Sequence, residues 1–109
     1  MKKIKPRVRA LKLAKEVRKR LTHALGQPVK VIMFGSQARG DATKESDIDL
    51  LVILPSINNK LLNLTSDIAW EVGFDAGRVI SAIPDTKEQM RLYGFLPFYR
   101  NIKEEGIVV

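Results

Sequence analysis

Two short apolar runs, at residues 29–34 and 48–54, constrain the fold of this chain more than any other feature. The first reads Val-Lys-Val-Ile-Met-Phe and ends at Gly35, and the second reads Ile-Asp-Leu-Leu-Val-Ile-Leu and ends at Pro55. Runs of this length that are rich in β-branched residues and bounded by glycine or proline are typical of strands. The second run is continuously apolar after its aspartate, which predicts a strand buried on both faces.

Polar residues stand at the ends of both predicted strands. Gly35-Ser36 follows the first run directly, and Asp47 and Asp49 flank Ile48 where the second run begins. Because side chains alternate between the two faces of a strand, both carboxylates point to one face, where they can hold Mg²⁺. Gly35 lets the backbone approach a phosphate, and Ser36 offers a hydroxyl and an amide at the start of a helical turn. This arrangement is typical of metal-dependent nucleotidyl transfer.

Two further residues near the motif are candidate ligands of a nucleotide. Arg39 lies close enough in sequence to contact a phosphate or to pair with Asp41 or Asp47, and the sequence does not choose between these roles. Ser46 can hydrogen-bond to the ligand or within its own loop, and an ordinary loop serine is the commoner case. The alternative for the whole motif is a plain turn with surface acids, but the buried run after Asp49 argues against it.

The positive charge of the chain is concentrated at its N-terminus. The net charge is +7, and residues 1–20 contain ten of the nineteen Lys and Arg but a single acid, Glu16. Pro6 and an apolar stripe that continues to Gly26 predict a basic amphipathic helix at about 6–26. The stripe consists of Val8, Leu11, Ala14, Val17, Leu21 and Leu25. A solvated helix face is the usual meaning of such charge, and nucleic-acid binding or contact with an acidic partner remain alternatives.

The rest of the chain predicts further alternation of helices and strands. Helices are expected at residues 57–73, after Asp85-Thr86 and at 98–105, and a strand is expected at 77–84. This order predicts one α/β (α+β) domain over 1–109, with helices packed against a mixed β-sheet. The chain has no cysteine, and hence neither a disulfide framework nor a thiolate metal site. With no membrane-length apolar stretch and no signal peptide, we expect a cytoplasmic protein.

The motif also carries a family resemblance. Residues 35–42 read Gly-Ser-Gln-Ala-Arg-Gly-Asp-Ala, and residues 46–52 read Ser-Asp-Ile-Asp-Leu-Leu-Val. These stretches resemble the signature of the minimal nucleotidyltransferases, the smallest members of the DNA polymerase β superfamily. The resemblance implies a polymerase β-like nucleotidyltransferase fold, in which Gly35 and Ser36 bind a nucleoside triphosphate and the catalytic Asp47 and Asp49 bind Mg²⁺. It also implies a helical HEPT-domain partner in a toxin–antitoxin pair, to which some members transfer AMP from ATP.

One position departs from the family pattern. The superfamily has a third carboxylate on a later strand beside the Asp-x-Asp pair, and the matching stretch here, Arg78 to Ile83, contains no acid. Ser81 stands near the expected position, while Asp75 and Asp85 lie before and after the strand. A serine is not an anionic metal ligand. Nucleotide binding can therefore persist where turnover is slow, because general base catalysis alone contributes about 10²–10⁴-fold.

Three functions follow as hypotheses. The first is a Mg²⁺-dependent nucleotidyltransferase that moves NMP, with ATP as the expected donor of AMP, to a protein or other hydroxyl acceptor within a toxin–antitoxin type pair. The second is a catalytically weak or inactive nucleotide-binding or antitoxin module that acts by complex formation. The third is a nucleic-acid-binding domain that uses residues 2–20. Homodimerisation is compatible with each of them, and no membrane association is expected.

Overall fold

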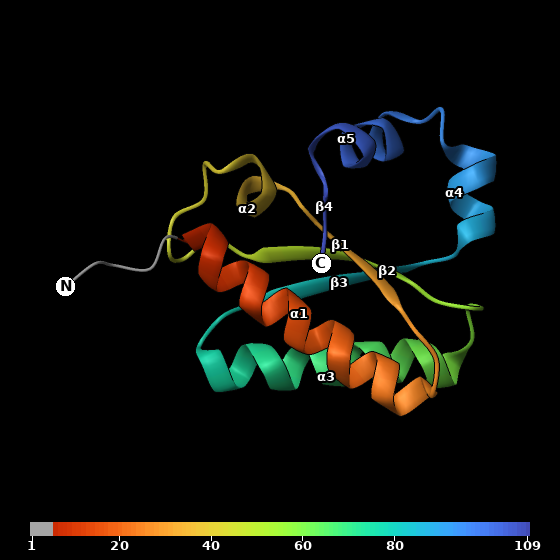
Figure 1. The fold of residues 1–109 in the computed structure, drawn as a ribbon, viewed down its shortest axis with the longest axis horizontal. Helices are drawn as coiled ribbons and strands as arrows, with labels where there is room; N and C mark the ends of the chain where they lie inside the picture. The colour runs from red at the N-terminus through yellow and green to blue at the C-terminus, as the bar shows by residue number, and fades with distance from the viewer. Residues whose placement is uncertain (1–5) are drawn as a thin grey trace.

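The computed structural model describes residues 6–109, which form one mixed sheet with helices on both of its faces (Figure 1). In chain order the elements are α1 (Pro6–Leu25), β1 (Lys30–Phe34), α2 (Ser36–Arg39), β2 (Ile48–Ile53), α3 (Asn59–Ala76), β3 (Ile80–Asp85), α4 (Lys87–Tyr93), α5 (Pro97–Glu105) and β4 (Ile107–Val108). The strand order is β3-β2-β1-β4, in which β2 and β3 are parallel and the other pairs are antiparallel. The predicted α/β class with a mixed sheet is confirmed.

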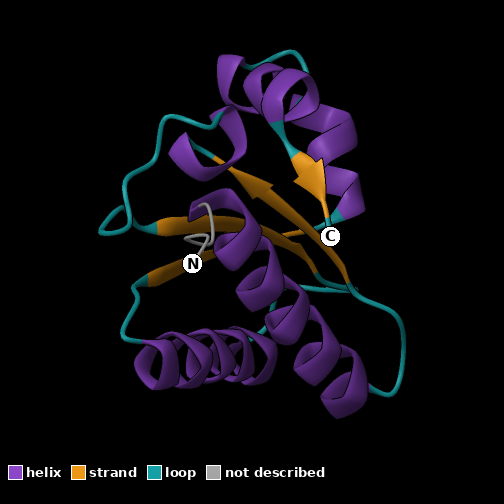
Figure 2. Ribbon diagram, turned by 60° about the vertical axis from the view of Figure 1, so that its left-hand side comes forward, coloured by secondary structure: helices purple, strands orange, loops and turns teal. Residues whose placement is uncertain are grey.

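The sheet separates two apolar clusters. The larger cluster joins alternate residues of β1 and β2 to α1 and α3, and the smaller one joins Ile32, Leu51 and Ile53 to Ile102 of α5. Figure 2 shows α3 along one side of the sheet and α5 on the other. Leu50, Leu51 and Val52 of β2 are fully buried, as its uninterrupted apolar run predicts. Full burial of each such side chain contributes about 1.5–3 kcal/mol. The buried part of β2 therefore holds the start of the same strand, where the carboxylates lie, in a fixed position.

Helix α1 matches the predicted basic helix, with a shifted apolar stripe. Ala14, Val17 and Leu21 are buried as expected, whereas Val8 is 44% exposed and Ala10 is buried in its place. None of the helices within residues 6–109 is both long enough and apolar enough to span a membrane.

Helix α3 does not end at Gly73, so that prediction was wrong. The helix continues to Ala76, and Gly77 ends it in the left-handed conformation with φ 66°. The amide of Arg78 donates to the carbonyl of Gly73 at 2.8 Å, and that of Gly77 donates to Phe74 at 3.1 Å, the paired hydrogen bonds of a Schellman motif. A Cβ at Gly73 would lie 2.5 Å from the Arg78 carbonyl oxygen. The glycine is required for this close return of the chain rather than as a helix stop.

Strand β3 contains Pro84, which was expected to end it. Proline has no N–H to donate, and it is tolerated in a sheet where its nitrogen faces away from the neighbouring strand at an edge. Strand β3 is an edge strand, and on its inner side Val79 accepts a hydrogen bond from Ile48 and Asp85 accepts one from Leu54, the residue after β2. By the alternation of backbone groups, the nitrogen of Pro84 therefore points outward. The opposite edge is β4, which was not predicted because two residues are too few to show a periodic pattern.

Candidate active site

The pairing of β1 with β2 brings the two halves of the motif together. Phe34 pairs with Asp49 in the antiparallel register, so the turn after β1 lies beside the start of β2. Gly35 adopts φ 73° and ψ −155°, a conformation that is essentially restricted to glycine. A Cβ at this position would overlap the carboxylate of Asp49. The backbone at Gly35 is therefore packed directly against one of the two predicted metal ligands.

The turn after Gly35 is a short helix closed by a second glycine. The amides of Ala38 and Arg39 donate to the carbonyl of Gly35 at 3.1 and 3.0 Å, and the amide of Gly40 donates to Ser36 at 2.9 Å. Gly40 has φ 91° and ends α2 in the left-handed region. Since the first N–H groups of a helix have no partner within it, the predicted phosphate-binding turn offers donors beside Asp49.

The two carboxylates form a negatively charged site without a countering ion pair. Burial raises the pKa of Asp49, the negative charge of Asp47 raises it further, and the positive charge of Arg39 opposes both. Neither aspartate takes part in an ion pair within residues 6–109. A divalent cation would relieve this repulsion, and oxygen ligands suit Mg²⁺. The donor set therefore fits the expected metal through Asp47 and Asp49.

The residue of β3 in register with Asp49, where the resemblance predicts a third carboxylate nearby, is a serine. In the parallel register of β2 with β3, Asp49 pairs with Ser81, so the two side chains share one face. Asp85 pairs instead with Ile53 at the other end of the strands, where it accepts hydrogen bonds from Tyr99 at 2.6 Å and from the Thr86 amide at 2.8 Å. Asp75 is exposed on α3. In the part of the chain that the structure describes, no group of three His, Cys, Asp or Glu residues could hold a metal ion.

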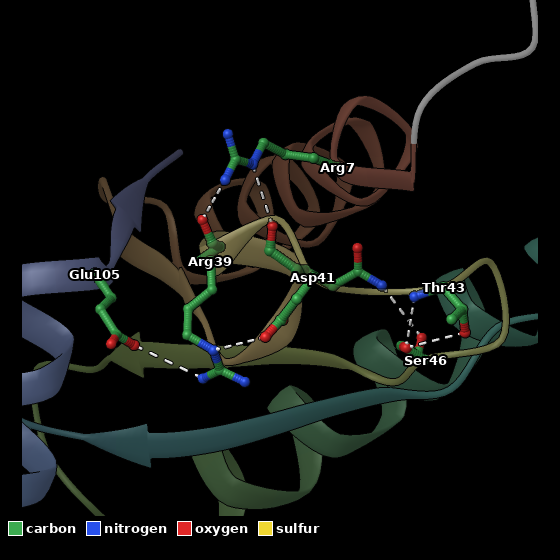
Figure 3. A network of polar contacts seen from close by, with 8 residues as sticks. Arg7, Arg39, Asp41, Thr43, Ser46 and Glu105 are labelled. Atoms are coloured by element: carbon green, nitrogen blue, oxygen red, sulfur yellow. Dashed lines mark hydrogen bonds and ion pairs between the residues drawn. The ribbon is translucent and has the colours of Figure 1, made fainter.

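Arg39 and Ser46 lie near the turn, each with protein partners (Figure 3). Arg39 Nε contacts Asp41 Oδ2 at 3.4 Å, and its Nη1 lies 3.7 Å from Glu105 Oε2. It makes no ion pair with Asp47. The hydroxyl of Ser46 accepts from the Thr43 amide at 2.9 Å and lies 3.2 Å from the Thr43 hydroxyl. Pairing within its own loop, the commoner case for such a serine, is thus what the structure shows for Ser46.

Three residues that support the site were not predicted. Gln37 is fully buried, and its Nε2 donates to the Ser46 carbonyl at 3.3 Å. Arg78 donates to the same carbonyl at 2.8 Å, so two side chains hold the residue before Asp47. Arg7 donates to the carbonyl of Ala38 at 2.6 Å, behind the phosphate-binding turn (Figure 3). The Arg7 and Arg78 contacts join residues more than thirty positions apart, which no local pattern reveals.

A glycine turn packed against Asp49, two residues after Asp47, at the end of a mixed sheet is the arrangement expected of the nucleotidyltransferase class of enzymes. The model of the nucleotidyltransferase domain family matches residues 12–109, and the chain belongs to that family. It is 37% identical over 84 residues to a candidate protein adenylyltransferase of Methanocaldococcus jannaschii. The aligned residues are 77% of this chain and 80% of the relative. The resemblance to a nucleotidyltransferase family is confirmed, and with it an enzyme of this class. Enzymes of this family generally use a divalent metal ion.

Two further comparisons are more distant. A bifunctional uridylyltransferase/uridylyl-removing enzyme of Pseudomonas fluorescens is 25% identical over 67 residues, which are 58% of this chain and 7% of that enzyme. The crystal structure of a candidate nucleotidyltransferase from Sulfolobus solfataricus superimposes with a TM-score of 0.64 at 22% identity, over 94% of this chain and 81% of that one. At this identity the second comparison establishes the shared fold.

Proposed function

We propose that this chain transfers AMP from ATP to a hydroxyl group of a protein and uses Mg²⁺ bound by Asp47 and Asp49. The observation that carries the proposal is the register of β1 with β2, which packs Gly35 against the Asp49 carboxylate. The relative named as a candidate protein adenylyltransferase, at 37% identity, supports AMP as the group and a protein as the acceptor.

The triphosphate is proposed to lie on the backbone N–H groups of the turn and on the Ser36 hydroxyl. Arg39 supplies a positive charge beside it. The ion pairs of Arg39 with Asp41 and Glu105 are exposed, and exposed pairs contribute only about 0–1 kcal/mol. The guanidinium can therefore turn to a phosphate at little cost. The hydroxyl of Ser46 is hydrogen-bonded to Thr43, and its carbonyl accepts from Gln37 and Arg78. Ser46 is therefore proposed to hold the loop before Asp47 in place rather than to contact the nucleotide directly.

In the proposed reaction, the acceptor oxygen forms a bond to the α-phosphorus as the bond to the β-phosphate oxygen breaks. Pyrophosphate leaves with the electron pair, and the hydroxyl proton passes to a base or to water. Mg²⁺, when bound, stabilises charge on the phosphates and favours loss of the hydroxyl proton. Ser81 cannot act as an anionic base beside Asp49. We therefore expect slow turnover together with normal binding of Mg-ATP.

We further propose that the acceptor belongs to a separate subunit, a HEPT-like helical protein in a toxin–antitoxin type pair. The described residues form a single sheet with its covering helices, so no second lobe within residues 6–109 holds an acceptor over the site. The partner would present a hydroxyl side chain, such as that of tyrosine, to the carboxylate face of β2.

The test uses the full chain, the protein encoded beside it, and ATP labelled at either the α or the γ phosphate. Label should pass to the partner from α-labelled ATP and not from γ-labelled ATP, and Asp49→Asn should abolish transfer. Asp67→Asn is the matched control, because Asp67 is an exposed acid on α3 away from the motif. Transfer of label from the γ position would indicate phosphoryl transfer. Equal activity of the Asp49→Asn and Asp67→Asn variants would show that Asp49 is not part of the active site.

A further inference from the structure

A pair of exposed aromatic side chains lies on α3 beside the open edge of the sheet. Trp70 and Phe74 are 64% and 69% exposed, and Val79 next to them is 61% exposed. The two rings stack on each other, with centroids 4.9 Å apart and an interplanar angle of 15°. Apolar side chains of this size are usually buried, and a contiguous exposed apolar patch marks an interaction site.

This aromatic patch, Trp70 with Phe74 and Val79, borders a groove of about 540 Å³ between α3 and β3. Ala69 and Gly73 form its helical wall, and Ile80 and Ala82 form its strand wall. Figure 1 shows α3 running alongside β3 at this side of the sheet. The groove therefore lies directly beneath the unpaired edge of β3.

The backbone of β3 has hydrogen-bonding groups available at this edge. Ile48 donates to Val79, and Leu54 donates to Asp85, so the odd-numbered residues of β3 face β2. By alternation, the N–H and C=O groups of Ile80 and Ala82 point outward and have no strand beside them. Pro84 also faces outward, but it has no N–H to donate, so it cannot exchange a pair of hydrogen bonds with an added strand. An added strand can thus pair with Ile80 and Ala82 only.

We propose that a second copy of this chain covers this surface, with β3 pairing antiparallel to β3 of the partner about a twofold axis at Ser81. In that register Ile80 of each copy faces Ala82 of the other, and each such pair exchanges both of its hydrogen bonds. The available edge is therefore complementary to itself. The twofold axis also brings the aromatic patches of the two copies to the same side of the joined sheet, where each can cover the other.

Charge is compatible with this pairing. The acids of α3 form a separate stripe, and Glu71 in that stripe lies 3.8 Å from Arg20 of α1. The acidic stripe is therefore turned toward the basic helix and away from the groove. Arg78 is the one charged residue that lines the groove, and it already donates to the Ser46 carbonyl. The contact surface is thus apolar, as a second identical patch requires.

The area sets the expected strength of the dimer. An aromatic side chain buries about 150–250 Å², so two rings that are about two-thirds exposed would remove roughly 200–330 Å² per copy. Stable specific interfaces bury a total of about 1,200–2,000 Å². The rings of both copies together would remove about 400–660 Å², so the interface, even with the paired strands added, lies at or below the small end of that range. We expect a reversible dimer with a dissociation constant in the micromolar range.

Sedimentation equilibrium across micromolar concentrations tests the proposal without nucleotide, so its outcome is independent of the transferase activity. The wild type should shift from monomer to dimer, and the double variant Trp70→Ser, Phe74→Ser should remain monomeric at every concentration. Phe95→Ser is the matched control, because Phe95 is 72% exposed and lies between α4 and α5, outside the groove. It should dimerise as the wild type does.

Hydrogen exchange tests the edge pairing in the wild type itself. The amides of Ile80 and Ala82 should exchange rapidly at low concentration and slowly at high concentration, whereas the Ser81 amide, which faces β2, should be protected at both. A wild type that stays monomeric, a dimer that survives the double variant, or outward amides whose exchange does not depend on concentration would each overturn the proposal. A different partner that covers Trp70 and Phe74 of the monomer would count against it equally.

Discussion

Replacing Gly35 with alanine tests whether the turn and the carboxylate strand form one unit. The backbone of Gly35, at φ 73° and ψ −155°, lies in a region that costs other residues about 1–3 kcal/mol. The added Cβ would also overlap the carboxylate of Asp49, and overpacking typically costs about 1–3 kcal/mol. We expect Gly35→Ala to lower the free energy of unfolding by about 2–6 kcal/mol, and by an amount near the lower value because the overlapped atom is the end of a side chain that can move. Mg-ATP binding should weaken, because Asp49 must move.

Gly77→Ala is the matched control. Gly77 also has a positive φ, 66°, but a Cβ there would meet nothing within 4 Å. Only backbone strain of about 1–2 kcal/mol should appear, with unchanged affinity for Mg-ATP. Urea unfolding followed by circular dichroism measures the stabilities, and calorimetry measures the binding. Equal losses of stability in the two variants, together with normal binding by Gly35→Ala, would refute the close packing of Gly35 on Asp49.

Three further predictions concern the surroundings of the site. Ser81→Asp places a carboxylate in register with Asp49 and should raise the transfer rate at saturating Mg²⁺; an unchanged rate would show that the serine does not limit turnover. Arg7→Met removes charged hydrogen bonds to two carbonyls of α2, and urea unfolding should show a loss of about 1.5–3 kcal/mol, with weaker Mg-ATP binding. Burial, with the hydrogen bond to Asp85, raises the pKa of Tyr99 from 10 to about 12. Between these pH values only the unfolded state releases the phenolic proton, so stability should fall as pH rises, and this fall should be smaller in Tyr99→Phe.

The elements of the fold were largely predictable because their signals are local. Helix α4 begins after Thr86, whose hydroxyl accepts from the Gln89 amide at 3.2 Å, and α5 ends at Glu105 before Gly106, both as the sequence indicates. The errors arose where the path of the chain after a helix, or the place of a strand in the sheet, decides the role of a residue. Gly73 permits the return of Arg78 over the helix, and Pro84 is tolerated because β3 has an open edge.

By itself, the sequence determined the mixed α/β class, the strand that carries Asp47 and Asp49, and the glycine turn before it, because alternation and turn chemistry act between near neighbours. Only the tertiary structure decided what surrounds them. It paired Ser81 with Asp49, and it placed Asp85 at the other end of β3, where Asp85 accepts a hydrogen bond from Tyr99. It also brought Gln37 and Arg78 to the carbonyl of Ser46, to which both donate. These contacts depend on which strands become neighbours, and that choice is made by burial of the whole sheet.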